Sequence, residues 1–134
     1  MPLCFPDLRA ACATAALLGV ISSATAGEPA PRTLEFVKDS PLPASVTLLT
    51  RQGPIGRDTP FYNGYRPQLR FAGMKDGVTC ALKLPPPADK LEPGETTDLT
   101  ATCLDTLRLR EDRLEFGVYE GGRQVGRGTL KPPR

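Results

Sequence analysis

The stretch YEGGRQVGRGTL, Tyr119 to Leu130, lies almost at the C-terminus and holds four glycines and two arginines. Glycine at this density occurs both in loops that bind nucleotide phosphates and in tight hairpin turns. A Walker-type phosphate loop has the pattern G-x-x-x-x-G-K-[ST] and opens a helix. Here Arg127 and Gly128 occupy the lysine and hydroxyl positions, and Pro132 and Pro133 prevent a helix from starting. The stretch therefore does not predict a nucleotide site.

A β-hairpin explains the same residues. Gly121-Gly122 fits a two-residue loop, in which positive φ is required and glycine supplies it. The segment 114–120 before this loop alternates between apolar and other residues, as a half-buried strand does. Gly126 and Gly128 share one face of the outgoing strand, which indicates a bulge, a sharp bend or a close approach of backbones.

The rest of the chain also predicts an all-β fold. Fifteen prolines and thirteen glycines interrupt it every few residues, and no long helical period is present. About seven short apolar segments at this spacing are typical of a barrel or sandwich. The predicted strands are 34–38, 45–51, 68–72, 78–84, 97–104, 114–120 and 123–130. We predict that the mixed-charge segment RLREDR (108–113) is a solvated loop or a single helical turn.

The composition excludes several kinds of catalytic site. The chain has 134 residues, a net charge of +2 and no histidine, so it has no imidazole base and no imidazole metal ligand. Cys80 and Cys103 alone are too few for a structural zinc site. Since there is no phosphate loop either, we expect no enzymatic activity, no cofactor and no bound nucleotide. The small net charge gives no general indication of nucleic-acid or anionic-lipid binding.

Residues 1–26 have the outline of a secretory signal peptide. An apolar run, 10–23, precedes Ala24-Thr25-Ala26, which fits the small-x-small pattern of a signal-peptidase site. The run of about 14 residues is shorter than the ~20 that span a bilayer. We therefore expect cleavage after Ala26, a periplasmic or secreted mature chain, and no transmembrane helix in it. The segment 1–9 is only weakly basic, so an uncleaved cytoplasmic chain is the alternative.

Five motifs follow one another along the chain. They are GRDTPFYNGYRPQ (56–68), Val78-Thr79 with Leu84-Pro85, LEPGE (91–95), LEF (114–116) and YEGGRQVGRG (119–128). Their order and approximate spacing over residues 45–130 resemble the C-terminal (third) β-barrel domain of bacterial elongation factor Tu. That domain carries a T-P-F-x-x-G-Y-R-P-Q loop, a V-T-G…L-P strand, an M-x-P-G-D turn, an L-R-F strand and a similar closing hairpin.

The resemblance implies a six-stranded antiparallel closed barrel over residues 45–131, preceded by a linker or first strand at 27–44. In the full factor this barrel is not catalytic. The GTPase domain and the middle barrel precede it there, and we expect the present chain to lack both.

The resemblance also implies a set of RNA-contacting positions. In the family this barrel faces the T-stem of aminoacyl-tRNA and the nucleotide exchange factor. By position, the RNA-facing residues would be Arg57, Thr79, Glu120 and Gly121. An arginine and a hydroxyl suit phosphates and 2′-hydroxyl groups.

Four departures from the family pattern lower the positive potential on or near this surface. They are Asp58 for a usual histidine, Thr106 for a common basic residue, and Glu115 and Tyr119 for two arginines. Each lost cation weakens phosphate binding, so these departures argue against tRNA binding.

Phe61, Tyr62 and Tyr65 allow two interpretations. They could form a stacking platform for bases, with Arg66 binding an anion. Packing at the barrel end, with Arg66 bracing the loop through backbone carbonyls, fits the same residues, and we favour it.

Cys80 and Cys103 are the cysteines outside the predicted signal peptide, which holds Cys4 and Cys12. By alternation, both fall on inward faces of predicted strands. Buried free thiols and a disulfide both fit, and an oxidising compartment would favour the disulfide. A disulfide requires the two strands to be neighbours, which the sequence does not establish.

Two functions from different classes follow. The first is an exported, non-catalytic binding module that recognises a protein or envelope partner. The second is a cytoplasmic accessory of translation elongation that binds aminoacyl-tRNA or the exchange factor. The cleavage site and the missing cations favour the first.

Overall fold

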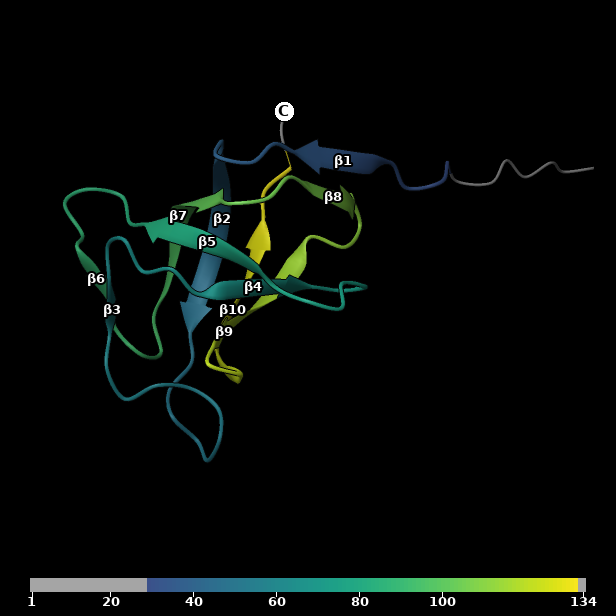
Figure 1. Cartoon of the computed structure of the whole chain (residues 1–134). Coiled ribbons are helices and arrows are strands. Elements are labelled where there is room, and N and C mark those ends of the chain that lie inside the picture. Colours follow the sequence, from purple (N-terminus) through teal and green to yellow (C-terminus); the bar gives the residue numbers. More distant parts are fainter. Residues whose placement is uncertain (1–28, 133–134) are drawn as a thin grey trace, which may run out of the picture. The chain divides into compact units, whose positions relative to one another are not determined.

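Six antiparallel strands close into a barrel in the computed structural model (Figure 1), which describes residues 29–132. Around the barrel the order is β10-β2-β7-β5-β4-β9. The strands are β2 (Pro41–Leu48), β4 (Gln68–Phe71), β5 (Val78–Lys83), β7 (Thr96–Cys103), β9 (Glu115–Glu120) and β10 (Arg123–Leu130). The predicted fold class is confirmed. The predicted signal peptide lies outside the described residues, and within them no helix is long and apolar enough to cross a membrane.

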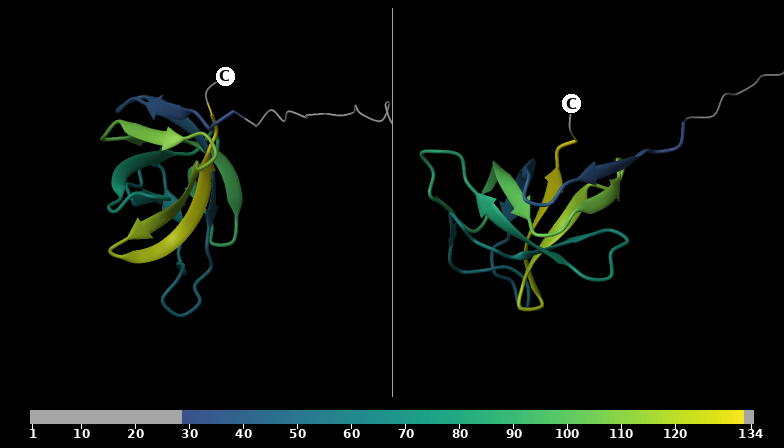
Figure 2. Two further views of the ribbon diagram at one scale, coloured as in Figure 1. Left: turned by 90° about the vertical axis from the view of Figure 1, so that its right-hand side faces the viewer. Right: turned by 45° about the horizontal axis from the view of Figure 1, so that its top comes forward.

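Two short ribbons accompany the barrel. β1 (Thr33–Phe36) pairs with β8 (Leu107–Arg110), and β3 (Phe61–Tyr62) pairs with β6 (Lys90–Leu91), both antiparallel. Figure 2 shows β1 and β8 side by side near the end of the barrel where β10 finishes. The segment predicted as a linker or first strand therefore contains β1, and the first barrel strand starts at Pro41.

The prediction of a loop or helical turn at 108–113 is wrong for its first half. Leu107 and Leu109 are 3% and 5% exposed, whereas Arg108 and Arg110 point to solvent. This is the period of two expected of a strand with one buried face. The arginines are accommodated because Arg108 pairs with Glu35 on β1 at 3.1 Å. The alternation of the two leucines therefore determines the structure, and the charges occupy the outer face.

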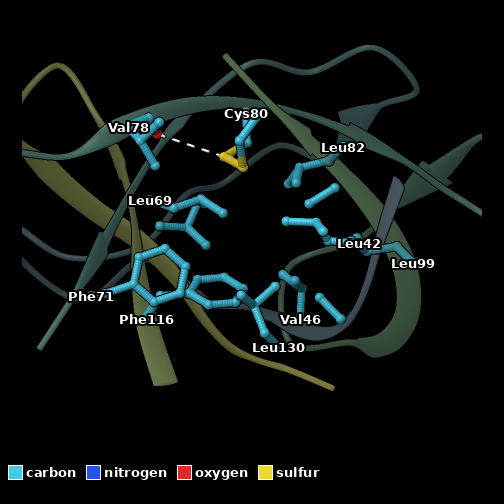
Figure 3. Packing of buried hydrophobic residues seen from close by; sticks show 14 of the residues in the cluster. Leu42, Val46, Leu69, Phe71, Val78, Cys80, Leu82, Leu99, Phe116 and Leu130 are labelled. Atoms are coloured by element: carbon cyan, nitrogen blue, oxygen red, sulfur yellow. Dashed lines mark hydrogen bonds between the residues drawn. A yellow bond between two sulfur atoms is a disulfide. The ribbon is translucent and has the colours of Figure 1, made fainter. Parts of the chain in front are cut away.

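The core fills the barrel interior with side chains from alternate positions of each strand. Figure 3 shows residues such as Val46, Leu69 and Leu82 converging on the interior, where each is at most 1% exposed. Phe71 and Phe116 pack with ring centroids 5.2 Å apart and planes tilted by 55°. Burying a side chain of this size stabilises the fold by about 1.5–3 kcal/mol. The inward faces predicted for 78–84, 97–104 and 114–120 are confirmed.

The β9–β10 hairpin has the predicted two-residue turn. Gly121 and Gly122 have φ of 58° and 84° and link Glu120 to its partner Arg123. Beyond the turn, the register shifts between Gln124 and Gly126. This bulge places one extra residue, the fully buried Val125, in β10, and a bulge also increases the local twist.

Gly126 and Gly128 lie where the backbone of β10 runs close to that of β2. A Cβ atom at Gly128 would lie 2.5 Å from the carbonyl oxygen of Ser45 and 2.6 Å from the ring of Phe116. At Gly126 it would lie 2.8 Å from the carbonyl oxygen of Thr47. Both glycines therefore allow β10 to approach β2, which is the close approach that the sequence indicated.

Candidate functional site

Arg57, Glu120 and Gly121 lie together at one end of the barrel. Arg57 belongs to the loop after β2 and is held by a hydrogen bond from its backbone N–H to the carbonyl oxygen of Leu49, at 3.0 Å. Glu120 is the last residue of β9, next to the Gly121-Gly122 turn. In Figure 1 this hairpin and the loop after β2 occupy the same end of the barrel. We call Arg57, Glu120 and their partner Tyr65 the Arg57 cluster.

All three guanidinium nitrogens of Arg57 donate hydrogen bonds within the chain. Nε donates to the carbonyl oxygen of Thr59 at 3.2 Å, and Nη2 donates to Thr59 Oγ1 at 3.1 Å and to the carbonyl oxygen of Pro60 at 3.3 Å. Nη1 forms an ion pair with Glu120. The Arg57 side chain is only 19% exposed, compared with 49% for Glu120. Arg57 therefore acts as a brace that ties its own loop to the β9–β10 hairpin.

Tyr65 completes the cluster. Its hydroxyl donates a hydrogen bond to the same Glu120 oxygen that receives Arg57. The guanidinium of Arg57 lies 5.2 Å from the centre of the Tyr65 ring, and Phe61 stacks on that ring at 4.9 Å. Burial, and then the hydrogen bond to Glu120, raise the pKa of Tyr65 to about 12. The hydroxyl is therefore a fixed, protonated donor at physiological pH.

Thr79 lies apart from the cluster. It is half-buried on β5, opposite Gln68 of β4, and Gln68 is in turn opposite Tyr119 of β9. One strand thus separates Thr79 from the strand that carries Glu120. The structure brings together three of the four positions implied by the resemblance and places the fourth on the neighbouring outer surface.

The four departures from the family pattern have partners of their own or lie exposed. Asp58 approaches Arg51 at 3.7 Å, and Thr106 Oγ1 accepts a hydrogen bond from the backbone N–H of Lys38 at 3.1 Å. The guanidinium of Arg70 lies over Tyr119, with its central carbon 4.2 Å from the centre of the Tyr119 ring. The ring of Tyr119 also covers Gly117, where a Cβ atom would lie 2.7 Å from it. Glu115 is exposed on β9.

An open hollow of about 570 Å³ adjoins the Arg57 cluster. It is lined by Arg57, Thr59, Pro60, Phe61, Tyr62, Asn63, Gly64 and Tyr65. Within this lining Phe61 is 2% exposed and Tyr62 is 57% exposed. The sequence did not indicate the hydrogen bond from Tyr65 to Glu120, because the two residues are 55 positions apart. The packing of Phe61 and Tyr65 agrees with the barrel-end interpretation. The prediction is wrong for Tyr62, which is exposed and available for a contact, and for Arg66, which is exposed and makes no side-chain hydrogen bond within residues 29–132.

Cys80 and Cys103 form a disulfide across two barrel strands. They are directly opposite each other in the β5–β7 ladder, with Cα atoms 3.9 Å apart and both side chains at most 1% exposed. The strand adjacency that the sequence could not establish is therefore present. The bond closes a segment with a sequence separation of 23 residues, which includes β6 and the run of three prolines at 85–87.

The described residues contain no group of three or more His, Cys, Asp or Glu side chains that could hold a metal ion. When the chain is compared with known protein families, no family model matches it. The candidate site consists of the Arg57 cluster, the hollow beside it and the outer face of the barrel.

Proposed function

We propose that this chain is an exported, non-catalytic binding module with a barrel of the elongation factor Tu C-terminal type. The proposal combines the five motifs in family order with the closed six-stranded antiparallel barrel. Its partner would be a protein or another component of the cell envelope. The Arg57 cluster would hold the end of the barrel rigid, so that the surface around Tyr62 keeps a constant shape.

The disulfide is the observation that carries the export part of this proposal. Disulfides persist in oxidising compartments such as the periplasm and are rare in the bacterial cytosol. Cys80 and Cys103 are bonded inside the core. A buried cross-link of this kind agrees with the signal peptide expected at residues 1–26.

The second candidate function, T-stem binding in the cytoplasm, is less favoured because of Arg57. A phosphate at this position would have to compete with Glu120, whose carboxylate already accepts a hydrogen bond from Nη1. The other two guanidinium nitrogens donate to Thr59 and Pro60. Arginine contacts phosphate through free N–H donors, and the hydrogen bonds within the chain use four of the five N–H groups of the Arg57 guanidinium.

The mass of the intact protein tests export. We expect the protein in the periplasmic or secreted fraction to begin at Gly27. We also expect its mass to rise by about two units on reduction, since a disulfide has two hydrogens fewer than two thiols. A full-length product with free thiols in the cytoplasm would contradict the proposal.

A salt titration tests the RNA alternative. A T-stem RNA hairpin is titrated with the wild type, with Arg57→Ala and with Arg113→Ala as the control. Arg113 is a suitable control because it is exposed and makes no side-chain ion pair within residues 29–132. Salt-sensitive binding that only Arg57→Ala removes would establish the alternative. We expect no such binding.

A further inference from the structure

A second hollow, of about 340 Å³, lies on the outside of the barrel over β9, β10 and β2, and we call it the β10 hollow. It is lined by Ser45, Thr47, Glu115, Phe116, Arg127, Gly128 and Thr129. The strand registers explain this set. Thr129 lies between Glu115 and Ser45 in one row, and Arg127 lies beside Thr47 in the next.

The polar lining points away from the core. Ser45 and Thr47 alternate with buried residues on β2, and Arg127 and Thr129 are exposed on β10. Phe116 belongs to the floor and is only 4% exposed, because its ring packs inside the barrel. The lining of the β10 hollow therefore holds three hydroxyls, one guanidinium and one carboxylate, and it holds no exposed aromatic ring. The hydroxyl of Thr47 is hydrogen-bonded to that of Thr96 at 2.7 Å, which leaves those of Ser45 and Thr129 for a ligand.

The two charged groups of the β10 hollow have no partner in the described part of the chain. Neither Arg127 nor Glu115 makes an ion pair or a side-chain hydrogen bond within residues 29–132. They are diagonal neighbours across the β9–β10 ladder, so one small ligand can reach both of them. This contrasts with Arg57, all of whose nitrogens are engaged. The guanidinium and the carboxylate are thus both available to a ligand that carries both signs of charge.

We propose that the β10 hollow binds a phosphoethanolamine group, which is a phosphate joined through two carbon atoms to a primary ammonium. This inference rests on the proposed function of an exported binding module and names the chemistry of its ligand. The phosphate oxygens would accept hydrogen bonds from Arg127 and from the hydroxyls of Ser45 and Thr129. The ammonium would donate to the carboxylate of Glu115.

Three features select this group over related ligands. Several converging donors suit a phosphate better than a carboxylate, which has fewer oxygen acceptors. A ligand with one positive and one negative centre matches the single cation and single anion of the lining. A quaternary ammonium such as choline is disfavoured, because it has no N–H to donate to Glu115 and is recognised by exposed aromatic rings, which this hollow lacks.

Soluble O-phosphoethanolamine provides the first test. The mature chain recovered from cells is titrated while backbone amide resonances are recorded by NMR. We expect saturable shifts at Ser45, Thr129 and Arg127 with roughly millimolar half-saturation, and weaker binding of phosphocholine. Shifts scattered over the surface, or equal binding of phosphocholine, would overturn the proposal.

Matched variants then test the two charges. Arg127→Gln should weaken binding of O-phosphoethanolamine by about tenfold or more. Glu115→Gln should abolish the preference over phosphocholine. The controls Arg113→Gln and Asp105→Asn remove the same charges from exposed positions outside the hollow and should change neither result. The amide spectra show in the same samples whether each variant is folded.

Vesicles identify the source of the group. Co-sedimentation is measured with phosphatidylcholine vesicles alone, with added phosphatidylethanolamine, and with added phosphatidylglycerol. Binding that requires phosphatidylethanolamine and is lost in Arg127→Gln assigns the group to a lipid headgroup. Binding of the soluble ester without vesicle binding assigns it to a free ester. Binding to phosphatidylglycerol alone, or no binding of either ligand, overturns the proposal. Export is tested separately by the intact mass, so failure of one is distinguishable from failure of the other.

Discussion

Loss of the Cys80–Cys103 bond should lower the stability of the barrel by about 3 kcal/mol. In the chain-entropy description, a cross-link stabilises by restricting the unfolded chain, and the effect grows with the length of the closed segment. A sequence separation of 23 residues corresponds to about 3 kcal/mol at 25 °C. For a domain of this size, that is equivalent to a fall in Tm of roughly 10–25 °C.

Two perturbations separate the cross-link from the packing of the sulfur atoms. Reducing the wild-type protein breaks the bond but keeps both sulfurs in the core, whereas Cys80→Ala/Cys103→Ala also removes them. The double variant should therefore be the less stable of the two, because it leaves small cavities. Unfolding is followed by circular dichroism in increasing guanidinium chloride, since the chain contains no tryptophan.

The control is the double variant with and without reductant, which should unfold identically. The cross-link should also reduce the surface exposed on unfolding, so the reduced protein should show a steeper dependence on denaturant. If the oxidised and reduced wild-type proteins unfold at the same midpoint, the entropic reasoning is refuted for this barrel.

Three further predictions concern the closure of the barrel and the Arg57 cluster. Gly128→Ala should destabilise the fold by about 1–3 kcal/mol, because its Cβ atom would meet Ser45 and Phe116. Thermal melting checks this against the exposed control Thr129→Ala, and equal melting temperatures of the two variants would contradict it. Because the pKa of Tyr65 is raised to about 12, protonated Tyr65 stabilises the fold below pH ~10, and this contribution is lost as the pH rises through about 12. Ultraviolet titration of the wild type should therefore show one tyrosine that ionises at a higher pH than an ordinary tyrosine. Glu120→Gln should lower that pKa, and an unchanged titration curve would argue against the hydrogen bond. Arg57→Ala should increase hydrogen exchange in the loop after β2 and at the β9–β10 turn, and unchanged exchange there would contradict its role as a brace.

Local patterns were sufficient to predict most of the barrel. The Gly121-Gly122 turn and the apolar alternation of 78–84 and 114–120 act over a few residues, so the sequence reports them directly. β8 was missed because arginines conceal the alternation of Leu107 and Leu109. β3 and β6 have two residues each, which is too short for a periodic signal.

The contacts of the candidate site depend on tertiary structure and could not be predicted in the same way. Arg57 and Glu120 are separated by 63 positions in the sequence, and they meet only because the loop after β2 folds back onto the hairpin. The opposition of Cys80 and Cys103 depends on the register of β5 and β7. Alternation places both cysteines inside, but it does not specify which strands are neighbours.

The start of the first barrel strand, β2, and the end of the last, β10, lie at the same end of the barrel. β1 leads through a short turn into Pro41, and the backbone N–H of Lys131 donates a hydrogen bond to the carbonyl oxygen of Pro43. Both views in Figure 2 place β1 and the end of β10 at one end of the barrel, with the β9–β10 turn at the other. A fluorophore or a surface linker attached after residue 131 would therefore leave the Arg57 cluster facing outward. Immobilised in this orientation, the protein would present its candidate contact end to the solution.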